Sequence, residues 1–302
     1  MSFENRREYL FVYSVKDANP NGDPLDANHP RYDEESGQIM VSDVRIKRTI
    51  RDQWLREGKD VFVDGEAKTL ANRVKELKEK FERDSGREIL SNCIDTRLFG
   101  VTYALGREAF SWTGPVQFKW GRSLHKAEAK FIQGTAAFAT TEASEQRSFR
   151  NEYIVPFALI AAYGIANQYA SKQTNATDDD LDSLFEALWK GTANLITRSK
   201  IGHTPRLLVE FKYIKGFDGV LGSLDEKITL KSFKGEPLSD DEQLALRSVD
   251  EVKLDISEIA EKASLIKEKI ESIRVIQDAS IKCDPLERLE NLFGGNLNIE
   301  VR

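Results

Sequence analysis

Apolar residues follow strand-like patterns in several short segments of the chain. Residues 9–15, YLFVYSV, combine β-branched and aromatic side chains, and residues 114–123 alternate apolar and polar positions. Residues 207–214, LLVEFKYI, predict a further strand, and residues 251–257, EVKLDIS, predict one nearer the end of the chain. Residues 131–141, FIQGTAAFATT, indicate a weaker strand pair.

Other segments show the wider spacing that is typical of helices. A helix is expected to begin at Ser42 or Asp43 as N-cap and to run to about residue 57. Residues 67–83 place apolar side chains on one seam of barely two heptads, which favours a core-facing helix over a coiled coil. Further helices are expected at residues 156–169, 178–196 and 256–276, and residues 142–152 are expected to form an exposed loop.

The order of these elements predicts an α+β protein with an antiparallel sheet, and a split βαβ arrangement is a plausible core. No internal repeat is found. The character of the chain changes at Gly216, after which a linker or hairpin precedes a more highly charged segment. We therefore divide the chain into residues 1–215 and residues 216–302.

Composition is ordinary for a soluble globular protein, with 40% hydrophobic and 31% charged residues. The longest apolar stretch, residues 153–166, is too short to span a bilayer, and the first residues do not resemble a signal peptide. Cys93 and Cys283 form no recognisable framework, so a reduced, cytoplasmic protein without membrane attachment is expected.

The net charge of −6 is unevenly distributed along the chain. Residues 216–302 hold 19 acidic and 12 basic residues, whereas residues 1–215 hold 31 acidic and 32 basic residues. A nearly neutral body with an acidic C-terminal part leaves room for a local cationic groove.

The stretch DANPNGDP, residues 17–24, raises the question of a metal cage, a catalytic carboxylate cluster or a tight bend. Asp17, Asn19, Asn21 and Gly22 match the first half of a calcium loop, but the twelfth position is Asn28 instead of Glu. A strand also precedes the run where a helix is required. We interpret the stretch, including Asp23, as a turn whose Asp and Asn side chains cap local backbone groups, and we predict no metal.

Signs of enzyme chemistry are weak. The three histidines, His29, His125 and His203, form no zinc motif, and no nucleophile elbow, Walker loop or dinucleotide fingerprint is present. We therefore assign no catalytic residue and no cofactor.

Three clusters of basic residues suggest contacts with phosphate. On the helix that begins at Ser42, Ile46, Ile50 and Trp54 form a narrow apolar arc, and four cations cover much of the remaining surface: Arg45, Lys47, Arg48 and Arg51. This surface is either a solvated helix face or a phosphate-contacting one.

The second cluster, in TRSKIGHTPR, holds Arg198, Lys200, His203 and Arg206, and Gly202 there could let the backbone approach a ligand. The third cluster holds Lys119, Arg122, His125 and Lys126. The neighbouring Phe118 and Trp120 either pack in the core or stack on bases, as aromatic residues do in proteins that bind single-stranded RNA.

The motifs NPNGDP, NHPRYD and VSDVRIKRTIRD together resemble the N-terminal part of the repeated backbone subunit of type I CRISPR Cascade complexes, a branch of the RAMP superfamily. DTRLFG, GPVQFKWGRSLH, YIVPFALIAAYG and RSKIGHTPRLLVEF continue this resemblance in order over about residues 8–215. The I-B branch is the most similar, and the stretch beyond Gly216 matches less clearly.

The resemblance implies a modified ferredoxin-like, RRM-type palm with an inserted finger region and a thumb, followed by an acidic C-terminal extension packed on the palm. The thumb is expected within residues 127–152. Such subunits line up as copies along the guide RNA (crRNA), support its pairing with a target DNA strand, and contact other Cascade subunits. A related branch cleaves RNA with an acidic loop residue, but we assign no such role to the Asp residues here.

On this basis we predict a non-enzymatic RNA-binding subunit with contacts from Arg45, Lys47, Arg48, Arg51, Arg122, Lys126, Arg198 and Lys200. Contacts with backbone and base faces suit a guide whose sequence varies. Two alternatives remain: a RAMP endoribonuclease that processes CRISPR RNA with His29 or His203 as general base, and an assembly protein that binds partners without RNA.

Overall fold

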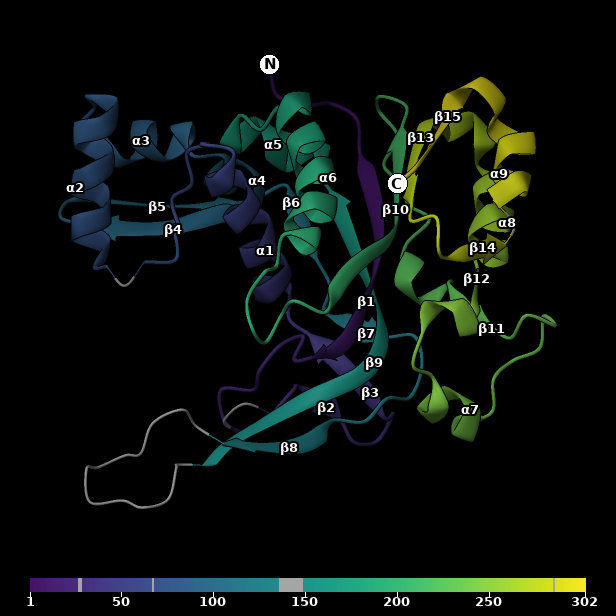
Figure 1. Cartoon of the computed structure of the whole chain (residues 1–302). Coiled ribbons are helices and arrows are strands. Elements are labelled where there is room, and N and C mark those ends of the chain that lie inside the picture. Colours follow the sequence, from purple (N-terminus) through teal and green to yellow (C-terminus); the bar gives the residue numbers. More distant parts are fainter. Residues whose placement is uncertain (27–28, 67, 136–148, 285) are drawn as a thin grey trace, which may run out of the picture.

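One large mixed sheet forms the centre of the molecule (Figure 1). The computed structural model describes residues 1–26, 29–66, 68–135, 149–284 and 286–302. The strands of the sheet follow the order β15-β13-β10-β1-β9-β7-β3-β2, and β6 and β8 also pair with the long β9. The strands are β1 Arg7–Ala18, β2 Tyr32–Asp33, β3 Gln38–Val41, β6 Val116–Phe118, β7 Gly121–Ser123, β8 Lys130–Thr135, β9 Phe149–Ala166, β10 His203–Tyr213, β13 Ile270–Gln277 and β15 Leu297–Val301.

The centre of this sheet has a ferredoxin-like arrangement. Along the chain β1 is followed by the helix α1 (Asp43–Arg56), the short strands β6 and β7, then β9, α6 (Asp178–Ala193) and β10. In space the antiparallel order is β10-β1-β9-β7, which is the split βαβ pattern. The predicted α+β class is therefore confirmed.

The helices α1 and α6 cover one face of the sheet. Ser42 caps α1 by accepting a hydrogen bond from the backbone N–H of Arg45, and Thr177 and Asp180 form a capping box on α6. The predicted apolar arc of α1 is confirmed, because Ile46, Ile50 and Trp54 are buried in the core that the helices share with the sheet. Because this arc packs against the sheet, the polar side of α1 faces away from the core.

A finger-like insertion between α1 and β6 has a small core of its own. It contains α2 (Leu70–Phe81), α3 (Gly86–Asn92), α4 (Ile94–Phe99) and the hairpin β4 (Gly100–Leu105) and β5 (Glu108–Thr113). Its core includes Val74, Leu77, Ile89, Tyr103 and Trp112. In Figure 1 this insertion lies at the opposite end of the molecule from the C-terminal segment.

The strand β8 and the first part of β9 form an antiparallel ladder that extends away from the rest of the sheet (Figure 1). This ladder lies within the predicted thumb region, of which residues 136–148 are outside the described part of the chain. Gly134 pairs with Arg150 and Lys130 pairs with Ile154. The two strands of the ladder are therefore in continuous register.

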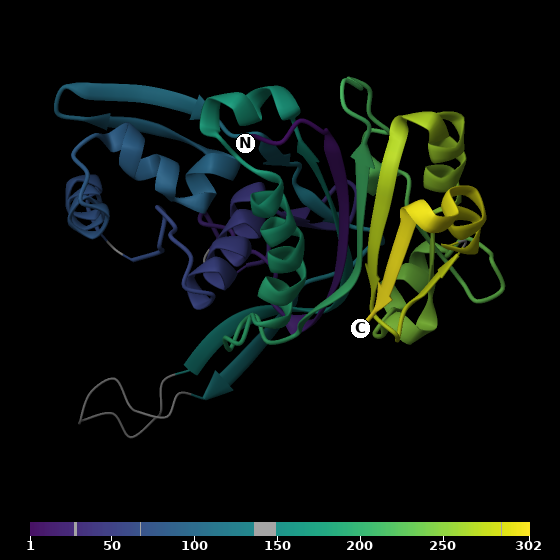
Figure 2. The ribbon, with the colours of Figure 1, turned by 90° about the horizontal axis from the view of Figure 1, so that it is seen from above.

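The C-terminal segment covers the second face of the sheet and adds β13 and β15 to its edge (Figure 2). Glu8 on β1 is fully buried and accepts hydrogen bonds from the backbone N–H groups of Leu221 (2.7 Å) and Gly222 (2.8 Å). The other elements are α7 Asp240–Ala245, α8 Ser257–Leu265, α9 Leu286–Phe293, the strands β11 Thr229–Lys231, β12 Lys253–Asp255 and β14 Lys282–Asp284, and the 3₁₀ turns Leu224–Glu226, Val249–Glu251, Lys267–Lys269 and Gly294–Asn296.

Two predicted helices are wrong. Residues 156–169 belong mainly to β9, followed by α5 (Gln168–Thr174), because a continuous apolar run fits a strand that is buried on both faces. Residues 256–276 form α8 and then β13, and here the sheet edge overrides a helical pattern. Trp120 does not continue the buried alternation, since it is 43% exposed. Within the described residues no helix has the length and apolarity that a membrane span requires.

Candidate nucleic-acid interface

The N-terminal turn joins two of the predicted cationic clusters. The side-chain oxygen of Asn21 accepts hydrogen bonds from the backbone N–H (2.8 Å) and hydroxyl (2.9 Å) of Ser42, the N-cap of α1. The backbone N–H of Asn19 donates to the carbonyl of Ser199, 3.0 Å away in the loop before β10. The stretch thus leaves the end of β1 and contacts both the N-cap of α1 and the loop before β10.

The remainder of the turn is held by local contacts. Asp17 has a left-handed backbone with φ of 48°, Gly22 forms a bridge with Pro30, and Asp23 accepts a hydrogen bond from the backbone N–H of Leu25. Across the described ranges of the chain, no group of three or more acidic, histidine or cysteine side chains is arranged to hold a metal ion.

Three of the four cations on α1 that were predicted to contact RNA have partners within the protein. Lys47 contacts Asp43 (3.3 Å), Arg48 contacts Asp52 (2.6 Å), and Arg51 contacts Asp95 (2.8 Å). The last pair is structural, because Asp95 is fully buried and also accepts hydrogen bonds from the backbone of the segment that follows α1.

Arg45 differs from its neighbours on α1. Its guanidinium donates to the hydroxyl of Thr49 (3.2 Å), and within the described residues it makes no ion pair with a carboxylate. Burial lowers the pKa of Arg45, but an arginine remains charged in a protein. The helix therefore holds one largely buried positive charge without a counter-ion.

Lys200 and His203 lie near Arg45 and complete what we call the Arg45 site. Lys200 donates to the carbonyl of Asn19, and burial, with the nearby charge of Arg45, lowers the pKa of Lys200 to about 8. His203 stacks on Tyr13 with 5.8 Å between ring centroids, and burial lowers its pKa to about 3. Two cations and a neutral imidazole thus meet at the turn.

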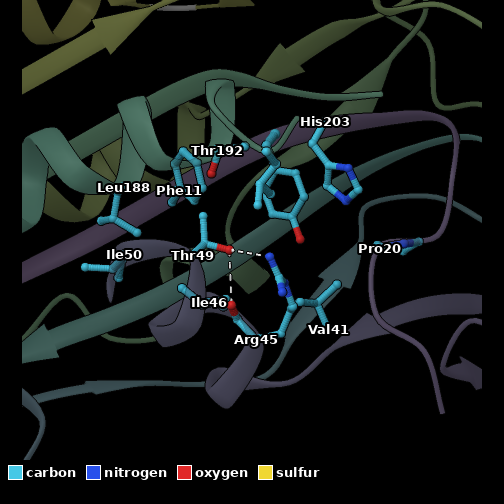
Figure 3. Close-up of a pocket in the computed structure, with 12 residues that line it drawn as sticks. Phe11, Pro20, Val41, Arg45, Ile46, Thr49, Ile50, Leu188, Thr192 and His203 are labelled. Atoms are coloured by element: carbon cyan, nitrogen blue, oxygen red, sulfur yellow. Dashed lines mark hydrogen bonds between the residues drawn. The ribbon is translucent and has the colours of Figure 1, made fainter. Parts of the chain in front are cut away.

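Arg45 and His203 approach one small cavity from α1 and from the start of β10 (Figure 3). The cavity has a volume of about 20 Å³, and Pro20 and Thr49 also line it. The Nε2 atom of His203 is buried and has no hydrogen-bond partner among the described residues. Because the space is sufficient for about one water molecule, a larger anion would have to bind at the mouth of the cavity.

Gly202 has a structural role in this loop. A Cβ atom there would lie 1.8 Å from the carbonyl oxygen of Lys16, so only glycine permits the close passage of these two backbones. The close approach is to the end of β1, and the suggested approach to a ligand is not needed to explain this glycine.

The third cluster lies along β7 and the residues beside it. Lys119 contacts Asp225 (3.1 Å) and Glu226, Arg122 contacts Asp33 (2.7 Å), and Lys126 contacts Asp240. Phe118 is buried in the core, whereas Trp120 is largely exposed and lies under the guanidinium of Arg31 at 5.2 Å. His125 is buried, and its ring nitrogens contact the backbone of Lys126 and Leu159.

Arg198 lies at the base of the β8–β9 ladder. It contacts Glu152 on β9 at 2.7 Å, and both line a cavity of about 240 Å³ together with Asp17 and Asn19. The cavity connects the N-terminal turn with the extended ladder. The structure thus brings Arg45 and Lys200 together at the turn, and Arg198 lies beside the same turn.

The sequence analysis missed the acidic partners of these cations. Asp95, Asp225, Glu226 and Asp240 are distant in sequence from the bases that they contact, and a single sequence contains no signal for such pairs. Tyr13 was missed as well, because β1 is buried on both faces up to Val15 and its contact with His203 arises only from tertiary packing.

Comparison with known proteins gives a consistent result. The chain matches the model of CRISPR-associated protein Cas7 over residues 5–257. It is 30% identical over 247 residues to the CRISPR-associated protein Cas7 of Haloferax volcanii, covering 72% of this chain and 73% of that protein.

Two solved structures have a similar fold. A chain of a CRISPR RNA-guided surveillance complex in a pre-nicking state has a TM-score of 0.54 at 13% identity, over 95% of this chain and 99% of that chain. A chain of a second CRISPR RNA-guided surveillance complex has a TM-score of 0.50 at 15% identity, over 89% and 88%. Fold and site together define a ferredoxin-like protein with cationic side chains at the N-terminal turn and around β7. The chain belongs to the CRISPR-associated protein Cas7 family.

Proposed function

We propose that this chain is a crRNA-binding backbone subunit of a type I surveillance complex, most similar to the I-B branch. Copies of it line up along the guide, contact other Cascade subunits and support pairing with a target DNA strand. Family membership and the surveillance-complex structures with a similar fold support this proposal. The I-B assignment rests on the sequence motifs.

The covered sheet suggests how such a subunit meets RNA. Both faces of the central sheet are packed, one by α1 and α6 and the other by the C-terminal segment, so neither offers a platform for bases. The contacts then fall on the sheet edges, the turn and the ladder, where phosphate groups are the common target. Phosphate contacts carry no sequence information, as a variable guide requires.

The Arg45 site is the observation that carries the proposal. Keeping Arg45 and Lys200 close together and away from water costs free energy, and no carboxylate of the described chain offsets that cost by an ion pair. A phosphate group at the mouth of the cavity would neutralise both charges and could accept hydrogen bonds from both side chains. The site therefore suits one backbone phosphate of the RNA.

The other basic residues that were predicted to contact RNA differ in how exposed and how strongly paired their side chains are. Arg198 is exposed and lies beside the turn, and although it contacts Glu152 at 2.7 Å it is the next candidate for a phosphate contact. Lys47, Arg48 and Arg51 would have to leave intramolecular partners to reach RNA, and their contacts remain predictions.

The test is co-expression of the chain with a guide RNA, followed by measurement of the absorbance ratio and the bound RNA. We expect ribonucleoprotein particles that contain intact guide, and loss of most RNA in Arg45→Ala/Lys200→Ala. The control Lys267→Ala/Lys269→Ala removes two exposed cations elsewhere and should retain the RNA. A nucleic-acid-free monomer that ignores added guide would exclude the proposal.

The endoribonuclease alternative has a separate test. A general base works best with a pKa near the working pH, whereas His203 is buried with its pKa lowered to about 3. Slow cleavage of a CRISPR RNA transcript in chelator, abolished by His29→Ala or His203→Ala, would favour the alternative. We expect no cleavage, and so no catalytic role for this chain.

A further inference from the structure

The residues Lys119, Trp120, Arg122 and Lys126, which we call the β7 strip, have the composition of a surface for single-stranded nucleic acid. The three bases lie on β7 or within three residues of either end of it, and an exposed indole lies between two of them. Trp120 is already stacked by Arg31, an arrangement that also receives bases. A cavity of about 310 Å³ lies beside Arg122 and is also lined by Asp225 and Glu226.

Every basic side chain of this strip forms an ion pair with a carboxylate. Asp225 and Glu226 contact Lys119, and Asp240 contacts Lys126, while Asp33 contacts Arg122. Three of these four acids belong to the C-terminal segment. The same segment holds 19 acidic residues against 12 basic ones, which is the charge imbalance in the sequence.

The acids are held in place by packing that does not depend on the ion pairs. Leu224, next to Asp225, is fully buried in the core beneath the sheet. Gln243 on α7 accepts a hydrogen bond from the backbone N–H of Lys126 (3.0 Å), which positions the start of that helix. The carboxylates are therefore presented to the lysines by a fixed backbone.

Two of these pairs are too exposed to be explained by stability alone, whereas the side chain of Asp225 is only 10% exposed. The side chains of Lys126 and Asp240 are 40% and 65% exposed, and those of Lys119 and Glu226 are 41% and 67% exposed. Exposed ion pairs contribute little to folding. Their clearer consequence is electrostatic, since a lysine that contacts a carboxylate attracts phosphate less.

We propose that the β7 strip is a second surface for single-stranded nucleic acid, and that carboxylates of the C-terminal segment hold it closed as phosphate mimics. While these carboxylates are in place, RNA binds at the Arg45 site and not at the β7 strip. The inference rests on the proposed function in taking RNA as the ligand.

The test measures affinity for a single-stranded oligoadenylate over a series of KCl concentrations. The variant Asp225→Asn/Glu226→Gln/Asp240→Asn frees two lysines, and each freed cation steepens the salt slope on single strands by about 0.7, or about 1.4 in all. The matched control Asp241→Asn/Glu261→Gln/Glu290→Gln changes the charge equally at exposed acids that make no ion pair in the described chain. The control should keep the wild-type slope.

Two further variants make the result unambiguous. Adding Lys119→Ala/Lys126→Ala to the neutralised chain should restore the wild-type slope. If the triple variant does not fold, Asp240→Asn against Asp241→Asn gives the same comparison with an expected difference of about 0.7. Equal slopes for neutralised and control variants overturn the inference. A wild-type chain without RNA affinity, by contrast, overturns the proposed function, and the neutralised variant still reports on the strip.

Discussion

The Arg45 site and the β7 strip are both cationic, but they differ in what surrounds the charges. Arg45 and Lys200 are largely buried and make no ion pair within the described chain, whereas Lys119 and Lys126 are half-exposed and contact carboxylates. The more buried charges thus lack counter-ions, which is the reverse of what folding stability favours. An arrangement that is costly in the free protein indicates a ligand that binds it directly, whereas a surface that is already neutralised can bind only after its carboxylates are displaced.

The same contrast exists within α1. Arg45 and Arg51 are less than two turns apart on the helix, yet Arg51 contacts a fully buried Asp95 and lies over the ring of Phe99 at 5.1 Å. Arg51 therefore connects α1 to the finger-like insertion, while Arg45 faces the turn. Two arginines of one helix therefore differ in role: Arg51 stabilises the packing of the insertion, and Arg45 faces the turn.

The largest expected effect comes from breaking the Arg51–Asp95 pair. Asp95→Ala leaves Arg51 half-buried without its partner and removes acceptors from two backbone N–H groups, so we expect a loss of about 3–5 kcal/mol in the free energy of unfolding. Urea unfolding measures this loss. Arg45→Ala is the matched comparison, and it should leave the stability unchanged or increased while RNA affinity falls. Similar losses of unfolding free energy in both variants would contradict a structural role for Arg51 and a ligand-binding role for Arg45.

A smaller effect is expected from pH at the Arg45 site. Lys200 has a pKa of about 8 in the free protein, and a bound phosphate would raise it, so binding takes up a proton above that pH. Affinity for oligoadenylate should then fall about tenfold between about pH 7 and pH 9. Of the groups that face Lys200, Arg45 stays charged and His203 stays neutral in this range, and Tyr13 has a raised pKa.

Lys200→Arg provides the control for this pH dependence, because its charge persists and the affinity should stay level. Folding responds in the opposite direction. Between about pH 8 and 10.5 the unfolded chain binds more protons at Lys200 than the folded chain, so this residue makes stability rise with pH. A wild-type affinity that does not change with pH would place phosphate away from Lys200.

Much of the fold could be predicted because it depends on local patterns. The strand at β1, the Ser42 cap and the apolar arc of Trp54 follow from spacing alone. The long β9 could not, since a strand buried on both faces has no alternation to distinguish it from a buried helix. For the site, the sequence showed which residues were basic but not which were neutralised, because Asp95 and Asp240 reach their partners only through tertiary packing.

The smallest effect tests whether the N-terminal turn positions the Arg45 site. Asn21→Ala removes the acceptor of the Ser42 N–H and hydroxyl, which should lower stability by about 1 kcal/mol and loosen the first turn of α1. RNA affinity should fall a few-fold because Arg45 lies in that turn. Asp23→Asn is the control, since among the described residues its side chain accepts a hydrogen bond only from the exposed N–H of Leu25. If both variants bind RNA like the wild type, the turn only shapes the chain and the Arg45 site keeps its geometry without it.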